Sequence, residues 1–71
     1  MPKLRVFSGE EVCSILAKNG FQRIHQRGSH IIMKNAEQGR TVPVPNHKEL
    51  DRGTLIGIIR QSGLQRSLFE T

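Results

Sequence analysis

The Gly28-Ser29 dipeptide limits the possible folds of this chain more than any other feature, because it separates two stretches that are both typical of strands. Residues 21–27 and 30–35 carry Ile, Phe and Met at their apolar positions. Glycine followed by a small polar residue is a signal for a two-residue hairpin loop. We therefore predict an antiparallel hairpin with a type II′ turn at Gly28-Ser29.

The two-residue loop also fixes which residues face each other across the hairpin. The predicted pairs are Arg27 with His30, His25 with Ile32, and Arg23 with Lys34. Opposed residues share a face of the sheet, as do residues two apart on one strand. One face is then predicted to be basic, with Arg23, His25, Arg27, His30, Ile32 and Lys34. The other is predicted to pack against helices through Ile24, Gln26, Ile31 and Met33.

Capping signals mark two helices on either side of the strands. Ser8 and Glu11 have the spacing of a capping box, and apolar residues follow at helical spacing until Gly20. This pattern predicts a helix over residues 9–19. A second helix is predicted to begin near residues 51–54 and to stop near Ser62-Gly63, since Leu55, Ile58 and Ile59 fall on one helical face.

Residues 40–44 are expected to form a third strand. Pro43 and Pro45 lie at its end and suit an edge strand, because proline has no N–H to donate to a neighbouring strand. The tail over residues 64–71 is expected to add one more helical turn against the core. It contains Leu68 and Phe69 among mainly polar residues.

The order of elements, α-β-β-β-α, predicts the α+β class, with a three-stranded antiparallel sheet and two helices on one of its faces. The 71 residues suffice for one domain, residues 1–71. Cys13 is the only cysteine, and we interpret it as a small apolar residue buried in the first helix, with a reactive thiol as the alternative. A lone thiol fits a reducing compartment, and no apolar run is long enough to span a membrane, so a cytoplasmic protein is expected.

Positive charge points to an anionic partner. Eleven Lys and Arg against six Asp and Glu give a formal net charge of +5. Nucleic acid is the commonest partner of so basic a small protein, and an acidic protein is the alternative. The chain has three Phe and neither Trp nor Tyr, which argues against base stacking on an aromatic platform. The predicted basic face suits contact with phosphates, although an inert solvated face is the other interpretation.

Among the three histidines, His30 has the most constrained setting because it directly follows the tight turn. RNA is cleaved when a general base removes the proton of a 2′-OH, whose oxygen then attacks the neighbouring phosphate while cations stabilise the transition state. Histidine exchanges protons near neutral pH, so His30 is the candidate general acid/base, with an ordinary surface histidine as the alternative. His25 is either a partner acid or a surface residue. His47 is expected to shape its loop or to contact phosphate through its neighbours.

Other chemistries find little support in the sequence. One cysteine and three scattered histidines do not supply the closely spaced ligands of a zinc site, so no metal is expected. There is no glycine-rich phosphate or dinucleotide loop, so no cofactor is expected. Ser29 is adjacent to His30 in sequence, which is poor geometry for a nucleophile and its base.

Several blocks of the sequence resemble the HicA (YcfA-like) toxins in order and spacing. They are Ser8-Gly9-Glu10-Glu11-Val12, Lys18-Asn19-Gly20-Phe21, Gln26-Arg27-Gly28-Ser29-His30, Val42-Pro43-Val44-Pro45-Asn46-His47-Lys48-Glu49-Leu50, Gly53-Thr54-Leu55 and Ile58-Ile59-Arg60-Gln61-Ser62-Gly63-Leu64. The resemblance covers about residues 4–64. It implies a double-stranded-RNA-binding-domain-like fold and an mRNA-cleaving toxin that is held inactive by a HicB-type antitoxin.

The resemblance also implies roles for single residues. The catalytic histidine of the family falls on His30, and the preceding glycine and serine fall on Gly28 and Ser29. Asp51-Arg52 departs from the more basic sequence of many relatives. The predicted RNA-binding residues are Arg23, Arg27, Gly28, Ser29, Lys34 and Lys48. We therefore expect a metal-independent endoribonuclease whose partners are mRNA and the antitoxin, with no membrane; a non-catalytic double-stranded-RNA-binding module is the alternative.

Overall fold

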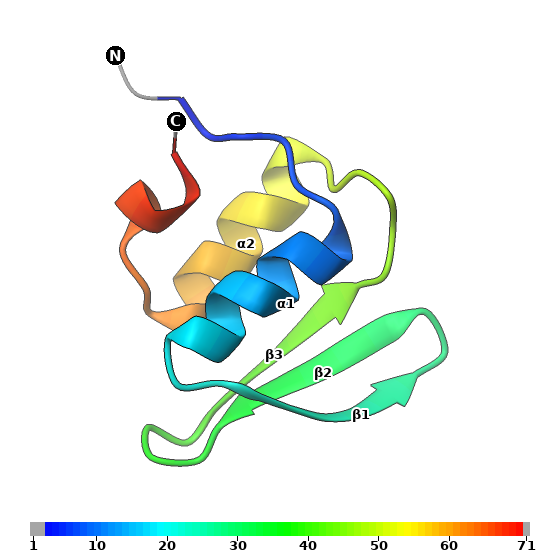
Figure 1. Cartoon of the computed structure of the whole chain (residues 1–71), viewed down its shortest axis with the longest axis vertical. Helices are drawn as coiled ribbons and strands as arrows, with labels where there is room; N and C mark the ends of the chain where they lie inside the picture. Colours follow the sequence, from blue (N-terminus) through cyan, green and yellow to red (C-terminus); the bar gives the residue numbers. More distant parts are fainter. Residues whose placement is uncertain (1–2, 71) are drawn as a thin grey trace.

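The computed structural model describes residues 3–70 and confirms the predicted order of elements (Figure 1). The elements are α1 (Gly9–Lys18), β1 (Gln22–Arg27), β2 (His30–Asn35), β3 (Arg40–Pro45), α2 (Arg52–Ser62) and a 3-10 helix, η1 (Arg66–Phe69). The strands form one antiparallel sheet in the order β1-β2-β3. The proline-containing strand β3 therefore lies at an edge of the sheet, as predicted.

Side-chain caps start both α-helices. The Ser8 hydroxyl accepts the Glu11 N–H at 3.1 Å, and the Glu11 carboxylate accepts the Ser8 N–H at 2.8 Å, so the predicted capping box is confirmed. The Asp51 carboxylate accepts from both the backbone N–H and the hydroxyl of Thr54. Gly63, with φ +71°, ends α2 in the left-handed conformation that glycine adopts most easily. Across residues 3–70, none of the helices has the length and apolar character needed to cross a membrane.

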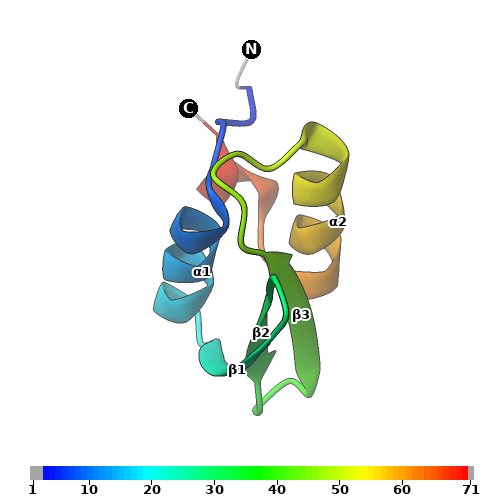
Figure 2. The ribbon, with the colours of Figure 1, turned by 90° about the vertical axis from the view of Figure 1, so that its right-hand side faces the viewer.

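Both α-helices cover the same face of the sheet (Figure 2). Alternate residues of β2 and β3 are almost fully buried against them, namely Ile31, Met33, Val42 and Val44. The helices contribute Val12, Cys13, Leu16, Leu55, Ile58 and Ile59 to the same core. The intervening strand residues Lys34, Thr41 and Pro43 are exposed. The opposite side of the sheet, which we call the open face, is therefore uncovered by any element of residues 3–70.

The C-terminal tail completes the core, as the sequence predicted. Phe69 in η1 is fully buried and packs edge-to-face on Phe7, with 5.9 Å between ring centroids. The Arg5 N–H donates to the Phe69 carbonyl at 2.9 Å, so the lead-in to α1 runs beside the tail. Leu68 remains 44% exposed and contributes little to the core. The end of the predicted tail, Thr71, lies outside the described residues.

Candidate nucleic-acid interface

The turn that precedes His30 has the predicted geometry. Gly28 has φ +59°, and no non-glycine residue within residues 3–70 has a positive φ, which is the combination that a type II′ turn requires. Arg27 faces His30 across the hairpin, as predicted. The Gln26 amide donates to the Gly28 carbonyl at 3.0 Å, which closes the turn from one side. The His30 backbone is thus fixed by strand pairing while its side chain is exposed.

The loop after β3 ties this turn to the start of α1. The Asn46 N–H donates to the Ser29 carbonyl at 2.6 Å, and the Gly9 N–H donates to the His47 carbonyl at 2.9 Å. Gly9 is needed at this position because a Cβ there would collide with the Pro45 carbonyl oxygen. Sequence reasoning missed the contact of Asn46 with the turn, because it uses only backbone atoms and leaves no signature in residue types. Lys48 is exposed on the same loop.

On the open face, paired residues of the three strands form three rows across the sheet. The first row is Arg27, His30 and Pro45; the second is His25, Ile32 and Pro43; the third is Gln22, Lys34 and Thr41. Five of the six residues predicted for the basic face therefore share it. His25 is the diagonal neighbour of His30, and such positions are about 7–8 Å apart, with their Cβ atoms somewhat closer. Lys34 is four residues along β2 from His30, which places it about 14 Å away.

The sixth residue, Arg23, lies on the helix-covered face, so its predicted placement is wrong. A β-bulge between Arg23 and His25 shifts the register, and Arg23 faces Met33 instead of Lys34. One extra residue in a strand exchanges the faces of everything beyond it. The Arg23 guanidinium bonds to the Glu10 carboxylate of α1 at 2.6 Å, and this hydrogen bond and the charge of Glu10 raise the pKa of Arg23.

The same bulge contains Ile24, which the sequence placed against the helices. Its side chain is 48% exposed, so that prediction is also wrong. The sequence showed no sign of the bulge, because Ile24 fits the alternation of apolar and polar residues that is typical of a regular strand. The acidic partner in the first turn of α1 was visible in the sequence, but nothing in the sequence connected it with β1.

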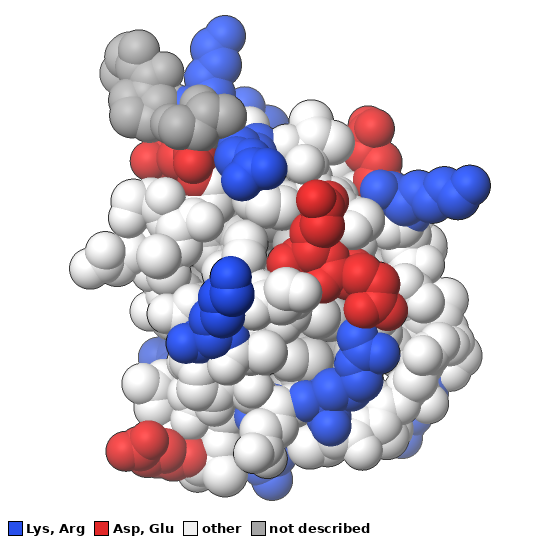
Figure 3. All heavy atoms as spheres, in the orientation of Figure 1, with Lys and Arg blue, Asp and Glu red and all other residues white. Residues whose placement is uncertain are grey.

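Negative charge is separated from the open face. None of the residues in its three rows is acidic. Figure 3 views the side that carries α1, where acidic and basic side chains are interspersed. Among residues 3–70 the ion pairs are Arg23 with Glu10 and Arg66 with Glu70, so neither Arg27 nor Lys34 is neutralised by a carboxylate. The open face therefore offers cations without competing acids, which is an arrangement that suits phosphate groups.

Cys13 lies in the core beneath the Arg23–Glu10 pair. It is 3% exposed, and burial raises the pKa of its thiol. This confirms the interpretation of Cys13 as a buried apolar residue. Over the part of the chain that the structure describes, no three His, Cys, Asp or Glu side chains are close enough together to hold a metal ion.

A comparison with known protein families matches the part of the chain that contains most of these features. The family model described as "HicA toxin of bacterial toxin-antitoxin" matches residues 9–64. The match contains α1, the whole sheet with its turn and open face, the loop that carries Lys48, and α2. The lead-in to α1 and η1 lie outside it. A search of the curated proteins finds no match to this chain.

Proposed function

The chain belongs to the HicA toxin family, and from this we propose that it is a toxin that acts as an mRNA-cleaving endoribonuclease with His30 as general acid/base. The observation that carries the proposal is the setting of His30. It is an exposed imidazole that a type II′ turn fixes beside Arg27, on a face with no acidic residue. Such a site can bind a phosphodiester and take a proton from the neighbouring 2′-hydroxyl.

Arg27 is the group that we assign to the reacting phosphate. It lies directly opposite His30, where Cβ atoms are about 5 Å apart, and it forms no ion pair within residues 3–70. Gly28 has no neighbouring atom within 4 Å of where a Cβ would stand, so a phosphate can approach the Gly28-Ser29 backbone closely. Lys34 and Lys48 then contact other phosphates of the same RNA strand. Arg23 is left out of this set because it is paired with Glu10.

The proposed reaction is transesterification within the RNA. His30 in its neutral form takes the proton from a 2′-OH, and the 2′-oxygen forms a bond to the adjacent phosphorus. The bond between phosphorus and the 5′-oxygen breaks, and the leaving oxygen takes a proton. Arg27 stabilises the additional negative charge on the phosphoryl oxygens in the transition state. The products are a 2′,3′-cyclic phosphate and a 5′-hydroxyl.

His25 is our candidate for the acid that protonates the leaving 5′-oxygen. It lies in the second row of the open face, diagonally across the hairpin from His30. Two imidazoles at this separation can stand on opposite sides of one phosphate, so that one accepts a proton while the other donates. His47 has no role in this reaction, because it lies in the loop after β3 and outside the three rows of the open face.

The activity is tested by incubating purified protein with a single mRNA fragment in the presence of EDTA. We expect cleavage with cyclic phosphate ends, and no cut at a linkage whose 2′-OH is replaced by hydrogen. Cleavage only after a divalent metal is added would contradict the metal-independent reaction. Salt-dependent binding without cleavage under any condition would instead support a non-catalytic double-stranded-RNA-binding module.

We also propose that a HicB-type antitoxin inhibits the protein by covering His30. The support for this is the family, together with an open face that no other element of residues 3–70 shields. In a complex with the antitoxin, His30 is expected to lose its solvent exposure. An inhibited complex in which this imidazole remains open to solvent would contradict the proposal.

A further inference from the structure

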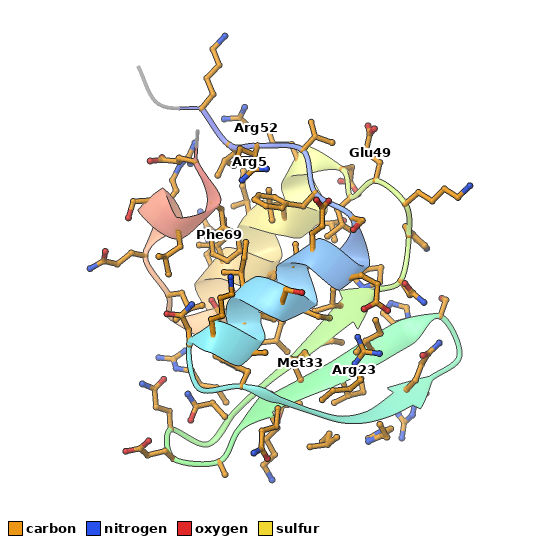
Figure 4. The ribbon with its side chains drawn as sticks, in the orientation of Figure 1. Arg5, Arg23, Met33, Glu49, Arg52 and Phe69 are labelled. Carbon is orange, nitrogen blue, oxygen red and sulfur yellow. The ribbon has the colours of Figure 1, made fainter. Side chains whose placement is uncertain are left out.

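A small pocket lies between the lead-in to α1 and the start of α2. Its volume is about 180 Å³, and its lining residues are Leu4, Arg5, Val6, Leu50, Arg52 and Leu55. None of these belongs to the rows of the open face. Figure 4 shows Arg5 and Arg52 at the same end of the molecule, above the core that contains Phe69. We call this site the arginine pocket.

The floor of the arginine pocket is apolar and its size fits one side chain. Four of its lining residues are Leu or Val, and the Val6 side chain is 67% exposed at its edge. Pockets for small molecules have volumes of roughly 300–1,000 Å³, well above that of this pocket. An exposed apolar side chain beside an apolar hollow is a feature of sites where another chain inserts an anchor residue.

The rim of the arginine pocket is positively charged. Neither Arg5 nor Arg52 forms an ion pair within residues 3–70. The Arg5 guanidinium is held over the Phe7 ring, 5.2 Å from its centroid, which restricts its position. The nearby Asp51 carboxylate accepts hydrogen bonds from Thr54 and forms no ion pair with Arg52. The two guanidinium groups are therefore free to bind carboxylates from outside the molecule.

We propose that the arginine pocket binds an acidic segment of a partner protein, which inserts one apolar side chain and pairs its carboxylates with Arg5 and Arg52. A protein segment fits better than RNA because the floor is apolar, whereas nucleic-acid interfaces are polar. This inference concerns a surface separate from His30 and is independent of RNA cleavage.

The test uses nitrogen-15 spectra of the full chain titrated with three short capped peptides. The first has one leucine between glutamates, the second replaces that leucine by serine, and the third has the same leucine between lysines. The first peptide is expected to shift the amides of Leu4, Val6 and Leu55 in a salt-dependent way. The second and third are expected to bind at least about tenfold more weakly.

Variants identify the groups responsible. Arg5→Glu and Arg52→Glu are each expected to lower the affinity for the first peptide by about tenfold or more. Arg60→Glu is the matched control, because it makes the same charge change on an exposed residue of the last turn of α2 and should bind normally. The proposal is overturned if the first peptide leaves these amides unshifted or binds equally to all three variants. It is also overturned if an RNA oligonucleotide shifts the pocket amides more strongly than the peptide.

Discussion

The Arg23 guanidinium bonds to the Glu10 carboxylate at 2.6 Å, and this contact fastens strand β1 to helix α1 on the side of the sheet opposite His30. An uninterrupted hairpin would instead place Arg23 beside Lys34 among the cations of the open face. Two arginines four residues apart in the sequence, Arg23 and Arg27, therefore have different environments. One is paired with an acid, and the other is available to bind an anion.

RNA affinity should distinguish these two arginines. Arg27→Ala is expected to weaken RNA binding and to reduce the slope of log affinity against log salt by about one, since one phosphate contact is lost. Arg23→Ala should leave both quantities close to those of the wild type. Filter binding or fluorescence anisotropy over a range of salt concentrations measures them. Equal losses for the two variants would mean that the bulge does not separate their roles.

Acid should weaken the capping box of α1. The backbone and side-chain hydrogen bonds of Ser8 lower the pKa of Glu11 from its ordinary value of 4.5. A carboxyl whose pKa is lower in the folded state stabilises the fold above its unfolded pKa, and the contribution is lost as pH falls through the folded pKa. The stability difference between wild type and Glu11→Gln should thus be present at pH 7 and should vanish below about pH 4.5, toward pH 2.

Urea unfolding at several pH values measures this difference. Glu37→Gln is the matched control, because Glu37 is exposed in the turn between β2 and β3 and forms no ion pair among residues 3–70. It should show little stability difference at any of these pH values. A Glu11→Gln deficit that is the same size in acid as at neutral pH would disagree with the charge-based account.

The tail outside the family match should be required for stability. Phe69→Ala removes a fully buried ring that packs on Phe7, and such a change costs about 3–5 kcal/mol. Leu68→Ala, at a residue 44% exposed, is expected to change the unfolding free energy by about 0.5 kcal/mol or less. Thermal and urea unfolding compare the two. Phe69→Leu retains part of the packing and gives an intermediate value if the alanine variant does not fold. Similar small effects for both residues would contradict the packing.

Much of the fold was predictable because its signals are local. The Ser8–Glu11 capping box, the positive φ at Gly28 and the prolines of β3 each depend on a few neighbouring residues, and each was predicted from residue types. The pairing of Arg27 with His30 follows from the turn alone. Prediction was wrong where the outcome depends on contacts between distant segments.

The bulge at Ile24 is the clearest such case. It shifts the pairing of every residue beyond it by one, so the register was right at Arg27 and His25 and wrong at Arg23. Beyond the bulge, Arg23 pairs with Glu10, which lies thirteen positions away in sequence. Likewise, the bond from Asn46 to Ser29 joins two loops through backbone atoms. The role of His30 in catalysis, by contrast, was expected from the family resemblance and stays a prediction.

Cleavage rates of His30→Ala and His47→Ala, measured side by side on one mRNA fragment in EDTA, test the central proposal most directly. Both histidines are exposed, so both variants should fold like the wild type, which circular dichroism and urea unfolding check. Loss of the general acid/base is expected to slow cleavage by about 10²–10⁴-fold in His30→Ala. His47→Ala should cleave at nearly the wild-type rate. A folded His30→Ala variant that cuts as fast as the wild type would contradict the assignment of His30 as the catalytic residue.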